Sequence, residues 1–176
     1  MKFEKCHIQD AYIITIEELS DERGFFSRAF DKKQFLENGL NTEIVQCNIS
    51  YSKFKGAFHG LHYQIPPYDE EKMVRCTRGK IFDVIVDTRK KSTTYKKWFG
   101  IELSHKNHRT LYVPRGCAHG FVTLEDDTEV FYQNTQIFSH EHERGVRWDD
   151  PMFQIKWPIK PIQISQKDSC WEHFKE

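Results

Sequence analysis

The sequence of 176 residues has no apolar run approaching the roughly 20 residues of a membrane-spanning helix. Its first residues, Met1–Lys5, hold no apolar segment of the kind found in a secretory signal. It also has no net charge, since 26 basic side chains balance 26 acidic ones, whereas binding along a nucleic acid or a membrane surface needs a positive field. We therefore expect a cytoplasmic protein with no nucleic-acid partner and no membrane partner.

The sequence also has no C-x-x-C pair. Its five cysteines are widely scattered: Cys6, Cys47, Cys76, Cys117 and Cys170. An odd count without paired spacing argues against a disulfide framework or a zinc finger and favours reduced thiols. Each cysteine is expected to act as a small buried hydrophobic residue.

Helical periodicity is scarce, and the hydrophobic pattern mostly alternates with a period of two. Five runs are predicted as strands: Tyr12–Ile16, Lys80–Asp87, Thr110–Val113, Gly120–Leu124 and Thr128–Asn134. The last two flank an acidic turn, Glu125–Asp127, and are predicted to pair as a hairpin. One helix is predicted at Asp31–Asn38, with Asp31 as its N-cap and Gly39 as its stop, and a shorter one around Trp171–Phe174.

Many short strands, frequent turns and little helix predict an all-β antiparallel sandwich or barrel, of which a jelly roll is the best member. No internal repeat, low-complexity tract or linker divides the chain, so we expect one domain over residues 1–176. The aromatic fraction of 14% supports a packed core rather than disorder. A jelly roll is also wide enough to hold a ligand between its two sheets.

The densest polar cluster on a predicted strand is His59–Gln64. Side chains alternate between the two faces of a strand, so His59 and His62 are predicted to point to opposite faces. They cannot face one centre unless a β-bulge intervenes. Taken alone, His62 is interpreted as a hydrogen-bonded structural residue.

Three further residues have a structural interpretation beside a functional one. Lys72 follows a charged stretch, so it is either a solvated loop lysine, which the local sequence favours, or a member of a strand whose other residues are apolar. Tyr132 is typical of a core or interface tyrosine. Asp168 has the place of an N-cap for the last helix.

The segment Pro114–Phe121 has the P-x-G-x-x-H spacing that cupin barrels use at a turn between strands, and His119 takes the position of their metal ligand. A complete cupin metal site would also have H-x-H, and this chain has H-x-x-H instead. A metal-dependent oxygenase or isomerase would use His62, His119 and either Glu70 or Glu71. We expect no metal and keep this function as an alternative.

Eight motifs follow one another along the chain without large gaps. They are Arg23-Gly24-Phe25-Phe26, Gln46-x-Asn48-x-Ser50, Gly60-Leu61-His62-Tyr63-Gln64, Lys72-x-Val74-Arg75-Cys76, Gly79-x-Ile81-Phe82-Asp83-Val84, Pro114-x-Gly116-x-Ala118-His119-Gly120-Phe121, Arg147-Trp148-Asp149-Asp150-Pro151 and Ser165-x-Lys167-Asp168. Together they closely resemble the dTDP-4-dehydrorhamnose 3,5-epimerase family. The resemblance implies a cupin-like jelly roll (a double-stranded β-helix) with a few short helices, usually a homodimer without metal or other cofactor. It also implies a nucleotide-linked 4-keto-6-deoxyhexose as substrate, in pathways that supply deoxysugars for surface polysaccharides.

The same resemblance assigns catalytic roles to four residues. A hydrogen on a carbon beside the C4 ketone is acidic, and inversion at C3, C5 or both needs a base on one face of the sugar and an acid on the other. His62 matches the base and Asp168 the partner that orients it. Lys72 matches the cation beside the C4 oxygen, where negative charge develops. Tyr132 matches the acid that returns a proton from the opposite face.

Substrate contacts are implied in the same way. Arg23, Gln46 and Asn48 match residues that contact the nucleotide and the pyrophosphate. Phe26 matches an aromatic residue that stacks on the base. His119 matches a supporting residue near the sugar.

Three positions depart from the family pattern. His59 stands where the family usually has a phosphate-binding arginine, which leaves that role to Arg75, Lys167 or another cation. Arg28 replaces a glutamate that would accept the thymine N3–H, and arginine can only donate. Phe138 replaces a tyrosine near the base, so it can stack but has no hydroxyl.

Two of these changes touch the base, so we expect a different nucleotide. CDP is the best candidate, because cytosine N3 is an acceptor. His59 and Arg28 also leave open a non-catalytic barrel that binds a sugar nucleotide without turning it over.

Overall fold

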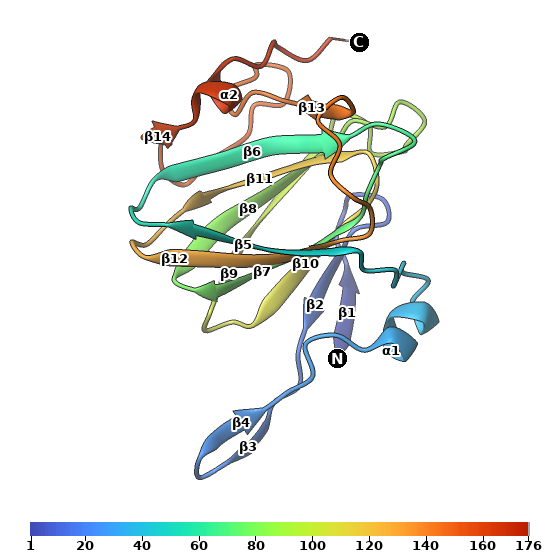
Figure 1. Ribbon diagram of the computed structural model, residues 1–176, viewed down its shortest axis with the longest axis vertical. Coiled ribbons are helices and arrows are strands. Elements are labelled where there is room, and N and C mark those ends of the chain that lie inside the picture. Colours follow the sequence, from blue (N-terminus) through green and yellow to red (C-terminus); the bar gives the residue numbers. More distant parts are fainter. Residues whose placement is uncertain (176) are drawn as a thin grey trace.

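The structure is a computed structural model that describes residues 1–175. This part of the chain has fourteen strands and two short helices (Figure 1). In chain order they are β1 (Lys2–Lys5), β2 (Tyr12–Thr15), β3 (Leu19–Asp21), β4 (Gly24–Phe26), α1 (Lys32–Glu37), β5 (Gln46–Ser52), β6 (Ala57–Gln64), β7 (Lys72–Arg78), β8 (Lys80–Asp87), β9 (Trp98–Ser104), β10 (Arg109–Val113), β11 (Cys117–Thr123), β12 (Thr128–Asn134), β13 (Glu143–Gly145), β14 (Gln163–Ile164) and α2 (Gln166–Ser169). Within residues 1–175, no helix is long and apolar enough to cross a lipid bilayer.

The strands form two facing sheets and one separate hairpin (Figure 1). The first sheet has the order β1-β2-β10-β7-β12-β5, and all its pairs are antiparallel. The second has the order β13-β6-β11-β8-β9, with the short β14 parallel to β6 at its edge. The hairpin β3–β4 extends away from both sheets at the lower end of Figure 1. The all-β jelly roll expected from the sequence is confirmed.

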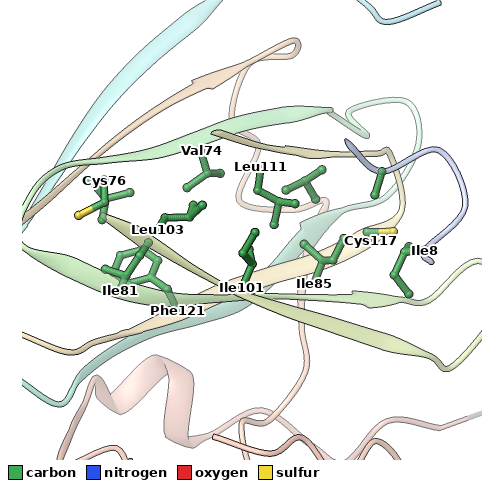
Figure 2. Close-up of a cluster of buried hydrophobic side chains, with 13 residues drawn as sticks. Ile8, Val74, Cys76, Ile81, Ile85, Ile101, Leu103, Leu111, Cys117 and Phe121 are labelled. Atoms are coloured by element: carbon green, nitrogen blue, oxygen red, sulfur yellow. The ribbon is translucent and has the colours of Figure 1, made fainter. Parts of the chain in front are cut away.

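The main core fills the space between the two sheets (Figure 2). Alternate residues of facing strands supply it, such as Ile81 and Ile85 of β8 and Val74 of β7. Val84 and Val86, on the other face of β8, belong to a second apolar cluster. Apolar residues of β8 point to both faces because both faces of this strand are covered.

Two segments outside the sheets pack on the outer faces of the sheets. One of them completes the second apolar cluster and the other forms a third. The stretch after β13 packs Phe153, Trp157 and Phe174 on the outer face of the second sheet. Helix α1 places Phe35 on the first sheet against Met73 and its neighbours. These two segments do not cover one end of the barrel. They also leave exposed the part of the first sheet's outer face that lies beyond α1.

All five cysteines are free, but only part of the expectation for them holds. Cys76 and Cys117 are buried in the main core, and burial raises the pKa of the Cys76 thiol to about 12. Cys47 and Cys170 are exposed, so the prediction of a buried residue is wrong for these two.

The first predicted helix is confirmed and the second is displaced. Asp31 caps α1, accepting a hydrogen bond from the Gln34 backbone N–H at 3.1 Å. The last helix, α2, begins after Ser165 rather than around Trp171–Phe174. The Ser165 hydroxyl supplies the cap, and the aromatic residues beyond the helix are used as packing anchors instead.

The predicted hairpin of Gly120–Leu124 with Thr128–Asn134 is wrong. β11 pairs with β6 and β8 in one sheet, whereas β12 pairs with β5 and β7 in the other. The acidic turn between them crosses from sheet to sheet and is tied to the neighbouring crossing loop, where the Lys55 N–H donates to Asp126 at 2.7 Å. Turn residues indicate that the chain reverses, but they do not indicate which sheet the next strand joins.

A β-bulge changes the face to which His59 points. On β11, His119 and Phe121 are two residues apart, but their partners on β6, His62 and His59, are three apart. The extra residue in β6 lets both histidines face the barrel interior, so the prediction of opposite faces is wrong. Gly60 makes this possible: a Cβ there would lie 2.6 Å from Gly120 Cα, and its φ is +110°.

We expect Gly60→Ala to lower the free energy of unfolding by about 1–3 kcal/mol, because both the backbone conformation and the contact with β11 exclude a Cβ. Urea unfolding followed by circular dichroism measures this change. Gly39→Ala is the matched control, since Gly39 has a φ of +72° but a Cβ there would meet no atom within 4 Å. A loss for Gly60→Ala no larger than that of the control would contradict the close-contact explanation.

Candidate active site

The open end of the barrel contains two adjoining hollows. Hollow A has a volume of about 460 Å³ and hollow B of about 230 Å³. Both have His62, Lys72 and Tyr132 in their walls, contributed by β6, β7 and β12. The residues that the sequence singled out for catalysis therefore meet where the two hollows join.

His62 and Asp168 form a hydrogen-bonded pair. The ring Nε2 of His62 lies 2.6 Å from Asp168 Oδ1, although the residues are 106 positions apart. Since an ionised carboxylate only accepts, Nε2 carries the hydrogen, which leaves Nδ1 with its lone pair. The pair has the geometry of a base oriented by a carboxylate.

Helix α2 places Asp168 under this ring. The Ser165 hydroxyl accepts from the backbone N–H of Asp168 at 3.0 Å, so Ser165 is the N-cap and the prediction of Asp168 as a cap is wrong. Only 4% of Asp168 is exposed. Burial acts to raise the pKa of Asp168, but the hydrogen bond and charge of His62, with help from Ser165 and the Gly60 backbone, hold that pKa below its ordinary value.

Glu143 is a site residue that sequence reasoning missed. Its Oε1 lies 3.6 Å from Nδ1 of His62 and 2.6 Å from Nζ of Lys167. The pairing of β13 with β6 brings it there. Glu143 lies three residues before Val146, in a polar stretch that leads to the Arg147 motif. Polar and apolar residues do not alternate in this stretch, so the sequence does not predict where the Glu143 side chain points.

Lys72 is held at the site by a buried counterion. Its Nζ lies 3.0 Å from Glu70 Oε1 and donates to the His62 backbone oxygen at 3.4 Å. Gln64 donates to the other oxygen of Glu70 at 2.7 Å. The Lys72 side chain is 12% exposed, so the interpretation as a solvated loop lysine is wrong.

Tyr132 faces the hollows from the sheet opposite His62. Burial raises the pKa of its phenol above the ordinary value, so the hydroxyl keeps its proton at neutral pH. A protonated phenol across the cavity from an imidazole is a pairing of acid with base.

The residues of the metal-dependent alternative are occupied by other partners. His119 Nε2 lies 2.7 Å from Oδ1 of the fully buried Asp83. Glu70 holds Lys72, and Glu71 is bound to Arg115 at 2.8 Å. Among residues 1–175, no three histidine, cysteine or acidic side chains gather as a metal site would require. His119 instead lines hollow B.

Hollow A also has the predicted nucleotide contacts from this chain, Gln46, Asn48, Phe138 and Lys167. Gln46 accepts a hydrogen bond from the Phe138 backbone N–H at 3.0 Å. The ammonium group of Lys167 lies 5.9 Å from the centre of the Phe138 ring. An aromatic face beside a cation is suited to a base and a phosphate.

His59 lines hollow B and not the nucleotide side. Its ring stacks on Phe121, with 4.9 Å between centroids, and its Nε2 is 2.9 Å from Ser52 Oγ. Burial lowers the pKa of His59, so at neutral pH this position carries no charge where the family has a cation.

Arg23, Phe26 and Arg28 are not brought to these hollows. Arg23 pairs with Asp21 within the hairpin at 2.6 Å, and Arg28 pairs with Asp31 at 3.5 Å. Phe26 is 65% exposed at the end of β4. The nucleotide contacts expected of these residues are therefore missing from the chain's own site.

A separate hollow of about 630 Å³ lies beside Tyr112 and is larger than either of these. Its arginines are already neutralised, Arg115 by Glu71 and Arg89 by Asp87. Its lining includes neither the His62–Asp168 pair nor Tyr132. Size alone therefore does not identify the active site.

Comparisons with known proteins agree with the geometry. The family described as dTDP-4-dehydrorhamnose 3,5-epimerase matches residues 5–176. An enzyme of that name from Sinorhizobium fredii is 45% identical over 170 residues, covering 96% of this chain and 87% of the relative. The Bacillus anthracis dTDP-4-dehydrorhamnose 3,5-epimerase, solved with TDP and PPi bound, superposes with a TM-score of 0.95 at 39% identity over 98% of this chain and 99% of that one.

A Legionella pneumophila relative was solved in complex with dTDP-4-keto-L-rhamnose. It has a TM-score of 0.92 and 36% identity, over 98% of this chain and 92% of that one. The chain thus belongs to the dTDP-4-dehydrorhamnose 3,5-epimerase family and is an isomerase of nucleotide deoxysugars.

Proposed function

We propose that the protein inverts C3, C5 or both of a nucleotide-linked 4-keto-6-deoxyhexose by removing a proton beside the C4 ketone and returning one to the opposite face. The observation that carries this proposal is the His62–Asp168 pair facing the half-buried phenol of Tyr132 across one cavity. The five free cysteines support a reducing, cytoplasmic location for this reaction.

The first step is proton removal by His62. Its Nδ1 accepts the proton from the sugar carbon, and the electrons of the broken C–H bond form a C=C bond while the C4 carbonyl becomes an enolate. Asp168 stabilises the imidazolium that results, because it is ionised and bound to Nε2. A hydrogen bond to a charged partner contributes about 1.5–3 kcal/mol.

Lys72 stabilises the enolate. Negative charge develops on the C4 oxygen, and a fixed cation at that point commonly contributes about 3–4 kcal/mol to the transition state. Glu70, itself held by a hydrogen bond from Gln64, keeps the ammonium group in place, so it need not reorganise as the charge appears.

Tyr132 completes the inversion by donating its phenolic proton to the carbon from the other face. The C=C electrons form the new C–H bond and the C4 ketone returns. His62 then loses its extra proton to solvent and Tyr132 regains one, so the cycle closes without any cofactor.

His62→Ala should abolish the incorporation of solvent deuterium at C3 and C5, because no base remains. Tyr132→Phe should retain exchange at one carbon and lose inversion, because only the return of the proton is blocked. Proton NMR of the sugar in D₂O measures both. His7→Ala is the control, since this exposed histidine lies outside both hollows and contacts the Trp98 backbone at the β9 edge of the second sheet. Wild-type behaviour of both site variants would show that the roles are misassigned.

We also propose that the protein is a homodimer in which each β3–β4 hairpin completes the partner's site. The hairpin carries Arg23 and Phe26 but extends away from the chain's own hollows. The outer face of the first sheet is uncovered beyond α1, with Ile49 67% exposed and Tyr51 also exposed. Arg75 on this face has a buried Nε that no described residue accepts from. A second copy would cover this face.

Mixing Arg23→Ala with His62→Ala protein tests the exchange of hairpins. If the hairpin acts on the partner, a mixed dimer has one site with both changes and one with neither. Random exchange of subunits then restores about a quarter of the wild-type sites. Turnover that stays at the level of the separate variants after subunit exchange would mean that the hairpin serves its own chain.

The nucleotide is proposed to be CDP. Phe138 offers a stacking face in hollow A, and Arg28 offers donors where a glutamate would accept from thymine N3–H. In the dimer, Arg28 reaches the partner's base together with Arg23 and Phe26, since all three lie in the hairpin region. Cytosine N3 and O2 can both accept from a guanidinium group.

We expect kcat/KM for a CDP-linked 4-keto-6-deoxyhexose to exceed that for its dTDP counterpart by about tenfold, or about 1.4 kcal/mol. Arg28→Glu should move the preference toward dTDP. Lys33→Glu, an equal charge change on exposed α1, is the control. A preference of the unaltered protein for the dTDP sugar would refute the CDP assignment and leave the epimerase proposal intact.

A further inference from the structure

Trp171 lies beside the catalytic pair without belonging to either hollow. It follows α2 directly, with Cys170 as the C-cap between them, so one short segment carries both Asp168 and Trp171. Its indole ring is 6.1 Å from the ring of His62, at an interplanar angle of 65°. The segment that carries Asp168 therefore also places an aromatic ring against His62.

The contact of Trp171 with β13 leaves no free space. A Cβ added to Gly145 would lie 2.1–2.3 Å from three atoms of the indole. Gly145 is in turn the strand partner of His62. The indole is therefore seated on the backbone that runs beside the base, and only glycine allows this approach.

Packing rather than hydrogen bonding holds the indole in this seat. Its Nε1 is buried and has no hydrogen-bond partner in the described part of the chain. Other contacts of α2 include the ion pair of Lys167 with Glu143 of β13 at 2.6 Å and the donation by Arg147 to the Ser169 backbone oxygen at 3.0 Å. The fit of the indole against Gly145 is thus the packing contact that, together with these polar contacts, sets the position of α2 beside β6 and β13.

We propose that Trp171 is a positioning residue that holds Asp168 at hydrogen-bonding distance from His62 and keeps water away from the outer side of the pair. The contact itself is read from this chain, but its effect on turnover rests on the proposed function. A loss of the indole lets α2 move, and an error of about 1 Å in the position of a catalytic group can cost about a hundredfold in rate.

Trp171→Ala should lower kcat by about 10–100-fold and change KM by less than about threefold, because the substrate does not touch the indole. Trp171→Phe should keep most of the rate, since a smaller aromatic ring still fills the seat. Trp157→Ala is the matched control: Trp157 packs on Phe58 and Phe82 of the same outer face, away from the catalytic pair. It should lose stability but keep kcat within about threefold.

Gly145→Ala tests the same contact from the other side. The new methyl group should displace the indole and lower kcat as Trp171→Ala does. The double variant Gly145→Ala/Trp171→Ala should be no slower than either single variant, because the two changes remove one shared contact. Multiplied losses in the double variant would contradict the proposal.

A second readout does not depend on turnover. Carbon-13 NMR of the Asp168 carboxyl group follows its titration directly. In Trp171→Ala the pKa of Asp168 should rise toward its ordinary value, because the hydrogen bond from His62 that lowers it is weakened. Trp157→Ala should leave it low.

The two readouts separate the two proposals. Absence of deuterium exchange in the unaltered protein would refute the proposed function, while the titration of Asp168 would still test Trp171. If exchange occurs but Trp171→Ala matches Trp157→Ala in both kcat and the pKa of Asp168, the inference about Trp171 is overturned.

Discussion

The hydrogen bond between His62 and Asp168 is the contact on which the rest of the site depends. It joins a barrel strand to a helix that comes 106 residues later. A histidine that removes a proton from carbon needs a lone pair on one ring nitrogen. The hydrogen bond to the carboxylate keeps the ring hydrogen on the other nitrogen and so leaves that lone pair available. The bulge in β6, the glycine approach to β11 and the cap of α2 by Ser165 all serve to bring these two side chains within 2.6 Å.

Each charged group of the site has one main partner of opposite charge. Lys72 is bound to Glu70 and Glu143 is bound to Lys167, so neither Lys72 nor Lys167 competes for Asp168. In a partly buried site such competition would be costly, because a charge taken from water needs a partner nearby. The two ion pairs let the imidazole sit between two carboxylates while interacting closely with only one of them.

Local pattern was enough for much of the scaffold. Alternation and apolar density predicted Lys80–Asp87 and Thr128–Asn134 with the bounds that β8 and β12 have. It failed where a distant contact decides the outcome. The face of His59 depends on a bulge that only the approach of Gly60 to Gly120 explains, and the burial of Lys72 depends on Glu70 and Gln64. Residue types alone gave Asp168 a capping role, and only the resemblance to a family paired it with His62.

Asp168 comes after every strand of the two sheets in chain order. Domains can fold while their chain is still being synthesised, beginning from the N-terminal end. The strands from β1 to β13 can therefore pair before the segment that carries Asp168 has left the ribosome. A nascent chain at that stage has its imidazole in the barrel wall but no carboxylate to orient it. Docking of α2 on the strands is thus the step that orients the imidazole, and it follows the closure of the main strands.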